Sequence, residues 1–130
     1  MKIAITSTEP SLDATVDPRF GRCRYFVIVD TESLAFDPIS NESAMESGGA
    51  GIKAAQTIVH SGAQAVITGN MGPNAFETLT AAGIKVFTGA TGPIKQIIQQ
   101  YKNGVLSSTE QPSVGSHHGM GVGRRGYGQR

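Results

Sequence analysis

The feature that most constrains the fold is a regular alternation, in the second half of the chain, of short apolar runs with segments of helical period. A stripe of apolar residues predicts a helix over residues 50–61, and two further helices begin at Pro73 and Pro93. Between them, residues 65–68 and 84–88 are short and β-branched, as strands are. Proline at a helix start and glycine after its end is the usual asymmetry. This alternation predicts a mostly parallel sheet with helices on its faces.

The first half of the chain predicts three more strands. Residues 3–7 form one buried strand, and residues 25–29 are continuously apolar, as in a strand covered on both faces. Residues 34–38 alternate, and Pro38 suits an edge strand because it cannot donate to a ladder. The second and third strands form a hairpin, so the 25–29 strand is antiparallel. The long segment 8–22 has no helical period, and a loop of that length usually has a function or is disordered.

Composition bounds the class of protein. A chain of 130 residues has room for one domain, which we place at residues 1–106. Residues 107–130 are rich in Ser, Gly, His and Arg, with little to bury, and are predicted to be a disordered tail. The net charge of +1 gives no global field for nucleic acid or an anionic membrane.

Cysteine usage and hydropathy indicate the compartment. The single Cys23 excludes an intrachain disulfide and fits a reducing environment. No apolar run approaches membrane-spanning length, and the first residues are too short an apolar stretch for a signal peptide. A cytoplasmic location is therefore expected.

Chain direction predicts where a ligand binds. Parallel strands end on one edge of the sheet, so Ser7 and the segments 8–23, 41–51, 69–73 and 89–93 should meet there. This is the edge at which open α/β sheets place their ligands.

The converging segments favour an anion. Three of them are glycine-rich turns into helices, whose N-termini present N–H groups and partial positive charge. Arg19, Arg22 and Arg24 add full charges. The guest could be phosphate, carboxylate or sulfide, although glycine-rich turns also occur simply because short connections need them, and no phosphate-binding fingerprint is complete. The candidate binding residues are Ser7, Arg19, Phe20, Gly21, Arg22, Asn41, Gly49, Gly51, Asn70, Met71, Gly72, Asn74, Gly89 and Gly92.

Three residues are candidate metal ligands. Cys23 lies between Arg22 and Arg24, whose charges would lower the thiol pKa and favour a thiolate ligand. The competing interpretation is a small buried hydrophobe. His117 and His118, near Met120, could bind a soft or borderline metal, or they belong to a solvated tail. One cysteine cannot hold an iron–sulfur cluster alone, so a bound cluster would bring most of its own ligands.

Four motifs occur in order along the chain: residues 16–23 (VDPRFGRC), 25–30 (YFVIVD), 49–52 (GAGI) and 69–76 (GNMGPNAF). Together they resemble the dinitrogenase iron–molybdenum cofactor biosynthesis family, which includes NifX-like carriers, NifB C-terminal domains and the orange protein. The resemblance implies a three-layer α/β/α, ribonuclease-H-like fold. Its five-stranded mixed sheet would have the order 3-2-1-4-5, with strand 2 antiparallel.

The resemblance also implies a function without catalysis. It implies noncovalent binding, carriage or scaffolding of an anionic metal–sulfur cluster, either an iron–molybdenum cofactor precursor or a molybdenum–copper sulfide. Such a cluster can be lost on purification. The implied partners are cofactor donor and acceptor proteins, with no nucleic acid or membrane, and the chain would be a monomer or a weak homodimer.

Three other functions compete with this one. A regulatory module for a nucleotide or small phosphate would use the same backbone donors. A metal-dependent nuclease would need several carboxylates around two metal ions, and the first strand has none, with only Asp13 and Asp17 nearby. A purely structural interaction domain, dimeric or not, would bind no ligand.

Overall fold

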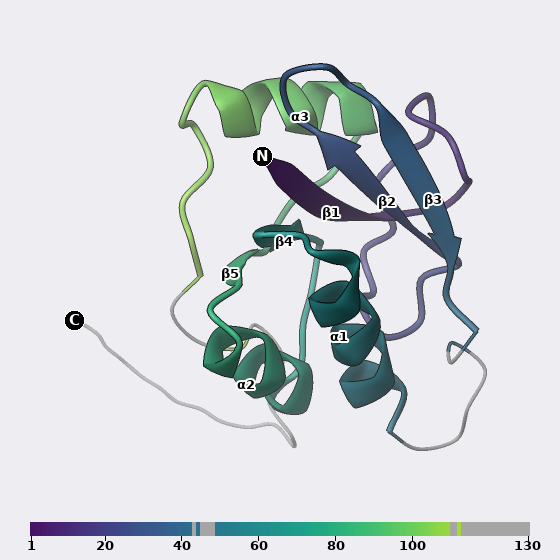
Figure 1. The fold of residues 1–130 in the computed structure, drawn as a ribbon, viewed down its shortest axis with the longest axis vertical. Coiled ribbons are helices and arrows are strands. Elements are labelled where there is room, and N and C mark those ends of the chain that lie inside the picture. Colours follow the sequence, from purple (N-terminus) through teal and green to yellow (C-terminus); the bar gives the residue numbers. More distant parts are fainter. Residues whose placement is uncertain (43, 45–48, 110–111, 113–130) are drawn as a thin grey trace.

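The computed structural model describes residues 1–42, 44, 49–109 and 112, which form a sheet with helices on both faces (Figure 1). None of the helices in this part of the chain is long and apolar enough to cross a membrane. The elements follow the expected order: β1 (Lys2–Ser7), β2 (Tyr25–Asp30), β3 (Phe36–Ser40), α1 (Ala50–Ser61), β4 (Ala65–Ile67), α2 (Pro73–Ala81), β5 (Lys85–Phe87) and α3 (Ile94–Lys102).

The five strands form one mixed sheet in the order β3-β2-β1-β4-β5, which confirms the predicted order. β2 is antiparallel to both β1 and β3, whereas β4 is parallel to β1 and to β5. β3 begins at Phe36, later than the expected Leu34. Leu34 has a φ of 63° and its N–H donates to the Asp30 carbonyl, so it closes the turn instead of starting the strand.

Alternation along the strands divides the interior into two cores. One core joins Ala4, Phe26 and Val66 of the sheet to α1 and α2. The other joins Ile5 and Val27 to Ile94, Ile97 and Ile98 of α3. Successive side chains of a strand point to opposite faces, so neighbouring residues of β1 and β2 supply different cores. α1 and α2 therefore share one face, and α3 lies alone on the other.

The chain continues in contact with the sheet after α3. Leu106 packs against the α3 core, and the Thr109 N–H donates to the Val86 carbonyl at 2.6 Å. The Thr109 hydroxyl accepts a hydrogen bond from the Thr88 N–H at 3.0 Å. This return segment, which follows the predicted boundary at Leu106, satisfies backbone groups on the edge of β5. The rest of the predicted tail lies outside the described residues, apart from residue 112.

Candidate functional site

The loop after β1 runs beside the segment that follows β4. Arg19 and Asn70 form a parallel bridge, the Phe20 N–H donates to the Asn70 carbonyl, and the Asn70 N–H donates to the Pro18 carbonyl at 2.7 Å. Gly69 makes this approach feasible, since a Cβ there would lie 2.7 Å from the Pro18 Cα. The loop is therefore attached to the carboxyl edge of the sheet like a short additional strand.

Asp17 holds the corner of this loop. Its side chain is 6% exposed, and its Oδ1 accepts a hydrogen bond from the Arg19 N–H at 3.0 Å. Oδ1 also lies 3.7 Å from the Arg19 Nε. The Asp17 backbone is hydrogen-bonded to Thr6 of β1. Its N–H donates to the Thr6 carbonyl, and its carbonyl accepts from the Thr6 hydroxyl. The carboxylate thus fixes the backbone from which Arg19 projects.

The same loop packs against the start of α1. A Cβ on Gly21 would lie 3.2 Å from both the Cα and the N of Gly51. Gly21 therefore serves close backbone packing. This contact brings residues 8–24, which we call the arginine loop, to the first turn of the helix.

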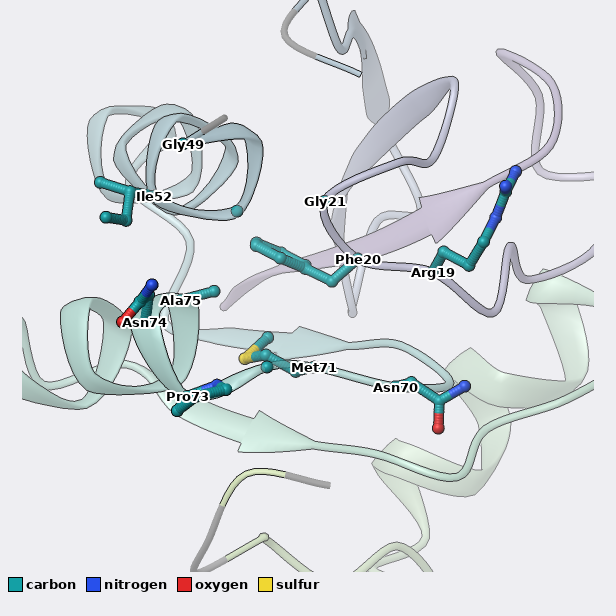
Figure 2. A pocket seen from close by; sticks show the side chains of 12 residues that line it. Arg19, Phe20, Gly21, Gly49, Ile52, Asn70, Met71, Pro73, Asn74 and Ala75 are labelled. Carbon is teal, nitrogen blue, oxygen red and sulfur yellow. The ribbon is translucent and has the colours of Figure 1, made fainter. Parts of the chain in front are cut away.

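These contacts enclose a cavity of about 400 Å³ between the loop and the starts of α1 and α2 (Figure 2). Neither helix start is capped by a side chain of the described residues. The first N–H groups of a helix have no partner within it, so both starts offer donors and partial positive charge. The cavity is lined by Arg19, Phe20, Gly21, Gly49, Gly51, Ile52, Asn70, Met71, Gly72, Pro73, Asn74 and Ala75.

The interior of this helix-start cavity is apolar. Figure 2 shows the Phe20 and Met71 side chains pointing inward, toward Ile52, while those of Arg19 and Asn70 point away from them. Phe20 and Met71 are almost completely buried, and Ile52 is 37% exposed. Polar donors therefore surround a floor made of an aromatic ring, a thioether and an aliphatic chain.

A second hollow, of about 580 Å³, adjoins the first and shares Arg19 with it. Its lining is Arg19, Arg22, Arg24, Tyr25, Ser40, Asn41 and Ala44, which we call the arginine hollow. The Arg22 Nη1 donates to the Ala44 carbonyl at 2.6 Å. The Asn41 amide donates to the carbonyls of Gly21 and Cys23. Arg22 and Asn41 thus belong to the neighbouring hollow and help to hold its walls together.

Cys23 does not have the electrostatics predicted from its neighbours. It is completely buried, and its Sγ donates to the Phe20 carbonyl at 3.3 Å. Burial, with the Asp17 charge next in size, raises the pKa of the Cys23 thiol to about 12. The lowered pKa expected from Arg22 and Arg24 is wrong, because removal from water outweighs nearby positive charge. Cys23 lines neither hollow.

Three further predicted residues do not line the cavity. Ser7 is buried, where its hydroxyl bonds the Glu9 backbone. Gly89 donates to the Gly69 carbonyl, so its turn begins at the expected edge. The turn then crosses to the face of α3, where the Gly92 carbonyl accepts from Val16. The prediction that residues 89–93 join the other two helix starts is therefore wrong, since the sheet lies between them.

The predicted histidine ligands, His117 and His118, lie outside the described residues. Within the described ranges, no group of three or more His, Cys, Asp or Glu side chains is arranged to hold a metal ion.

Sequence reasoning missed part of the lining. Ile52, Pro73 and Ala75 border the cavity, yet they carry no side-chain donor and are not among the predicted binding residues. Their position gives a usable signal, because each lies in the first turn of a helix that begins at a glycine.

The model of a family described as dinitrogenase iron–molybdenum cofactor matches residues 1–104. The chain belongs to this family.

Several relatives support this membership. An uncharacterized protein of Methanocaldococcus jannaschii is 32% identical over 113 residues, which cover 85% of this chain and 92% of that protein. The apo form of the orange protein from Desulfovibrio gigas has a similar structure, with a TM-score of 0.84 and 43% identity over 86% of this chain and 95% of the other. A putative NifB protein from Thermotoga gives a TM-score of 0.72 and 37% identity, over 82% of this chain and 91% of the other.

Proposed function

We propose that this chain binds an anionic metal–sulfur cluster noncovalently in the helix-start cavity and carries or holds it for transfer. The observation that supports this most is the pairing of two uncapped helix starts around one cavity of about 400 Å³. Membership of the iron–molybdenum cofactor family and similarity to the orange protein agree with such a cargo.

The donors suit a guest with many acceptor atoms. The two helix starts supply backbone N–H groups that need no rearrangement, and Arg19 adds a full charge at the rim. None of these contacts is a covalent bond to metal. A cluster bound in this way brings its own sulfide ligands, which allows both binding and release, as carriage requires.

The apolar floor favours sulfide over oxygen anions. Phosphate oxygens are strongly hydrated, and burying them against Phe20, Met71 and Ile52 would remove water without replacing all of its hydrogen bonds. Sulfide surfaces are softer, and the Met71 thioether and the aromatic ring are polarisable partners for them. The same cavity is therefore expected to discriminate against phosphate.

The test is retention of a thiometalate by the purified chain. Tetrathiomolybdate with copper is added to the chain, unbound reagent is removed by desalting, and the visible spectrum and metal content are measured. The double variant Arg19→Ala, Arg22→Ala should retain at least about tenfold less, since it loses the charge of Arg19 at the rim of the cavity and that of Arg22 in the adjoining hollow. The matched control is Lys85→Ala, Lys102→Ala, which removes two exposed charges outside both hollows. Equal retention by the wild type and the arginine variant would reject this site.

The alternative is a regulatory module that binds a nucleotide or small phosphate through the same N–H groups. Calorimetry with ATP and with inorganic phosphate, compared with thiometalate, separates the two functions. Tight phosphate binding with no thiometalate retention would favour the regulatory module.

The remaining implications of the family resemblance stay proposals. They are the ribonuclease-H-like classification, a carrier role without catalysis, and partners that donate and accept the cluster. Nuclease chemistry needs several carboxylates around two metal ions. The rim of the helix-start cavity instead offers glycine, asparagine and arginine.

A further inference from the structure

The arginine hollow differs in chemistry from the helix-start cavity, and its strongest feature is Arg24. Arg24 is exposed and lines the hollow. With the part of the chain that the structure describes, its guanidinium forms no hydrogen bond or ion pair. Arg24 is not among the predicted binding residues, and it does not line the proposed cluster site.

Among the residues that the structure describes, the charged side chains lining the hollow are all positive. Arg19, Arg22 and Arg24 line it, and no described Asp or Glu does so. Arg19 is partly neutralised by Asp17 at 3.7 Å, and Arg22 donates to the Ala44 carbonyl, but the Arg19 side chain is still 65% exposed. Tyr25 and Ser40 add hydroxyl groups to the same wall. The described lining of the hollow thus presents hydrogen-bond donors and no acidic side chain.

We propose that this hollow docks an acidic segment, rich in Glu or Asp, of a partner protein. Guanidinium groups pair with carboxylates through two parallel hydrogen bonds, and the Tyr25 and Ser40 hydroxyls can take part in the same recognition. A concave space of about 580 Å³ holds a few carboxylate side chains, whereas a membrane or a duplex presents a broad array of phosphates. The chain as a whole carries a net charge of only +1, which gives no wide field for such an array.

The shared Arg19 couples docking of the acidic segment to retention of the guest. It lines both spaces, so a carboxylate segment in the hollow and an anionic guest in the cavity use the same guanidinium and repel one another. Docking therefore weakens retention of the guest. This consequence rests on the proposed function, while the docking itself is measured on the empty chain, so the two fail separately.

The experiment measures binding of a fluorescein-labelled hexaglutamate peptide to the empty chain by fluorescence anisotropy at low ionic strength. Arg24→Glu should weaken peptide binding at least about tenfold, because it replaces attraction by repulsion at the hollow. The matched control is Lys102→Glu, the same charge reversal at the far end of α3, which should bind as the wild type does. Circular dichroism verifies that both variants are folded.

Three results would overturn the proposal. The first is that the wild type does not bind the peptide. The second is that Arg24→Glu and Lys102→Glu weaken peptide binding equally. The third is that a labelled DNA duplex or anionic vesicles bind more tightly than the peptide, with the same dependence on Arg24. Arg24→Ala should retain thiometalate as the wild type does, because Arg24 does not line the helix-start cavity. If the wild-type chain does not retain thiometalate, the proposed function is rejected, but the peptide-binding result still stands.

Discussion

The three helix starts come from similar glycine-rich turns, yet two border an open cavity and one is closed. At α1 and α2 the arginine loop approaches but leaves space, and the cavity forms there. At α3 the same loop, further upstream, covers the start, because the Ile94 N–H donates to the Ala14 carbonyl and Thr15 forms a bridge with Pro93. A helix start is thus available to a ligand only where the chain does not supply the acceptors itself.

The loop that follows β1 contributes to both the closed and the open helix starts. Residues 14–16 close the start of α3, whereas residues 19–21 form a wall of the cavity. Asp17 lies between them and is held by Thr6 from the sheet. The open and closed sides are therefore parts of one attached segment.

The largest expected effect concerns Cys23, which is buried beside Phe20 of the open cavity. With a thiol pKa of about 12 against an ordinary 9.0, alkylation at pH 8 should be about a thousandfold slower than in the unfolded chain. Iodoacetamide labelling followed by mass spectrometry, with a urea-denatured control, measures this. Rapid labelling of the folded chain would show that the open side reaches deeper than its lining residues.

The same group sets a pH dependence. The folded pKa is raised, so the stabilisation from the neutral thiol is fully present below pH 9.0 and is lost as the pH rises toward 12. Unfolding free energies of wild type and Cys23→Ala should therefore converge at alkaline pH. Parallel curves would contradict the raised pKa.

The next effect tests the contact that fixes the open side. Gly69→Ala should reduce the free energy of unfolding by about 1–3 kcal/mol, because its Cβ would overlap the Pro18 backbone. Gly72→Ala is the matched control, since a Cβ there meets nothing within 4 Å and the φ is −81°. Urea denaturation measures both variants. Equal stability of the two would mean that the loop is not held against Gly69.

A smaller effect separates the two sides by function. Gly49 and Gly92 have φ values of 73° and 94°, so alanine at either position should cost about 1–2 kcal/mol of stability. Only Gly49→Ala should also reduce thiometalate retention, because only Gly49 borders the cavity. Thermal denaturation and the desalting assay measure the pair. A loss of retention in Gly92→Ala alone would reverse the assignment of the two sides.

The smallest effect tests the segment that follows α3. Thr109→Val should cost about 0.5–1.5 kcal/mol, because the Thr88 N–H loses its acceptor. Thr109→Ser keeps the hydroxyl and should match the wild type in urea denaturation. If valine were tolerated as well as serine, this segment would not stabilise the edge of β5.

Much of the fold was predictable from short stretches of sequence. Proline at position 73 and glycine after residues 61 and 82 marked helix ends, and the continuous apolar run in β2 marked a strand covered on both faces. The start of β3 was predicted too early, at Leu34 instead of Phe36. Leu34 has a left-handed backbone conformation, which is unusual for leucine, and no local sequence signal indicates it. The strand order followed from the family resemblance, since adjacency of strands is not a local property.

The edge of the sheet at which the candidate site lies was predictable, but the shape of the site was not. Strand direction correctly brought Arg19, Gly49 and Gly72 together. It did not separate Arg22 into a second hollow or assign α3 to the other face. These outcomes depend on which face each crossover helix takes and on side chains distant in sequence.

The sequence by itself determined the succession of strands and helices and the ends of most of them, because periodicity and turn chemistry act over a few residues. Only the tertiary structure decided which helix starts stay open, which arginines share a space, and that Cys23 is a neutral buried thiol. The physical reason is that availability and ionisation depend on desolvation and competing hydrogen-bond partners. Those are supplied by residues such as Ala14 and Asn41, far along the chain from the groups they affect.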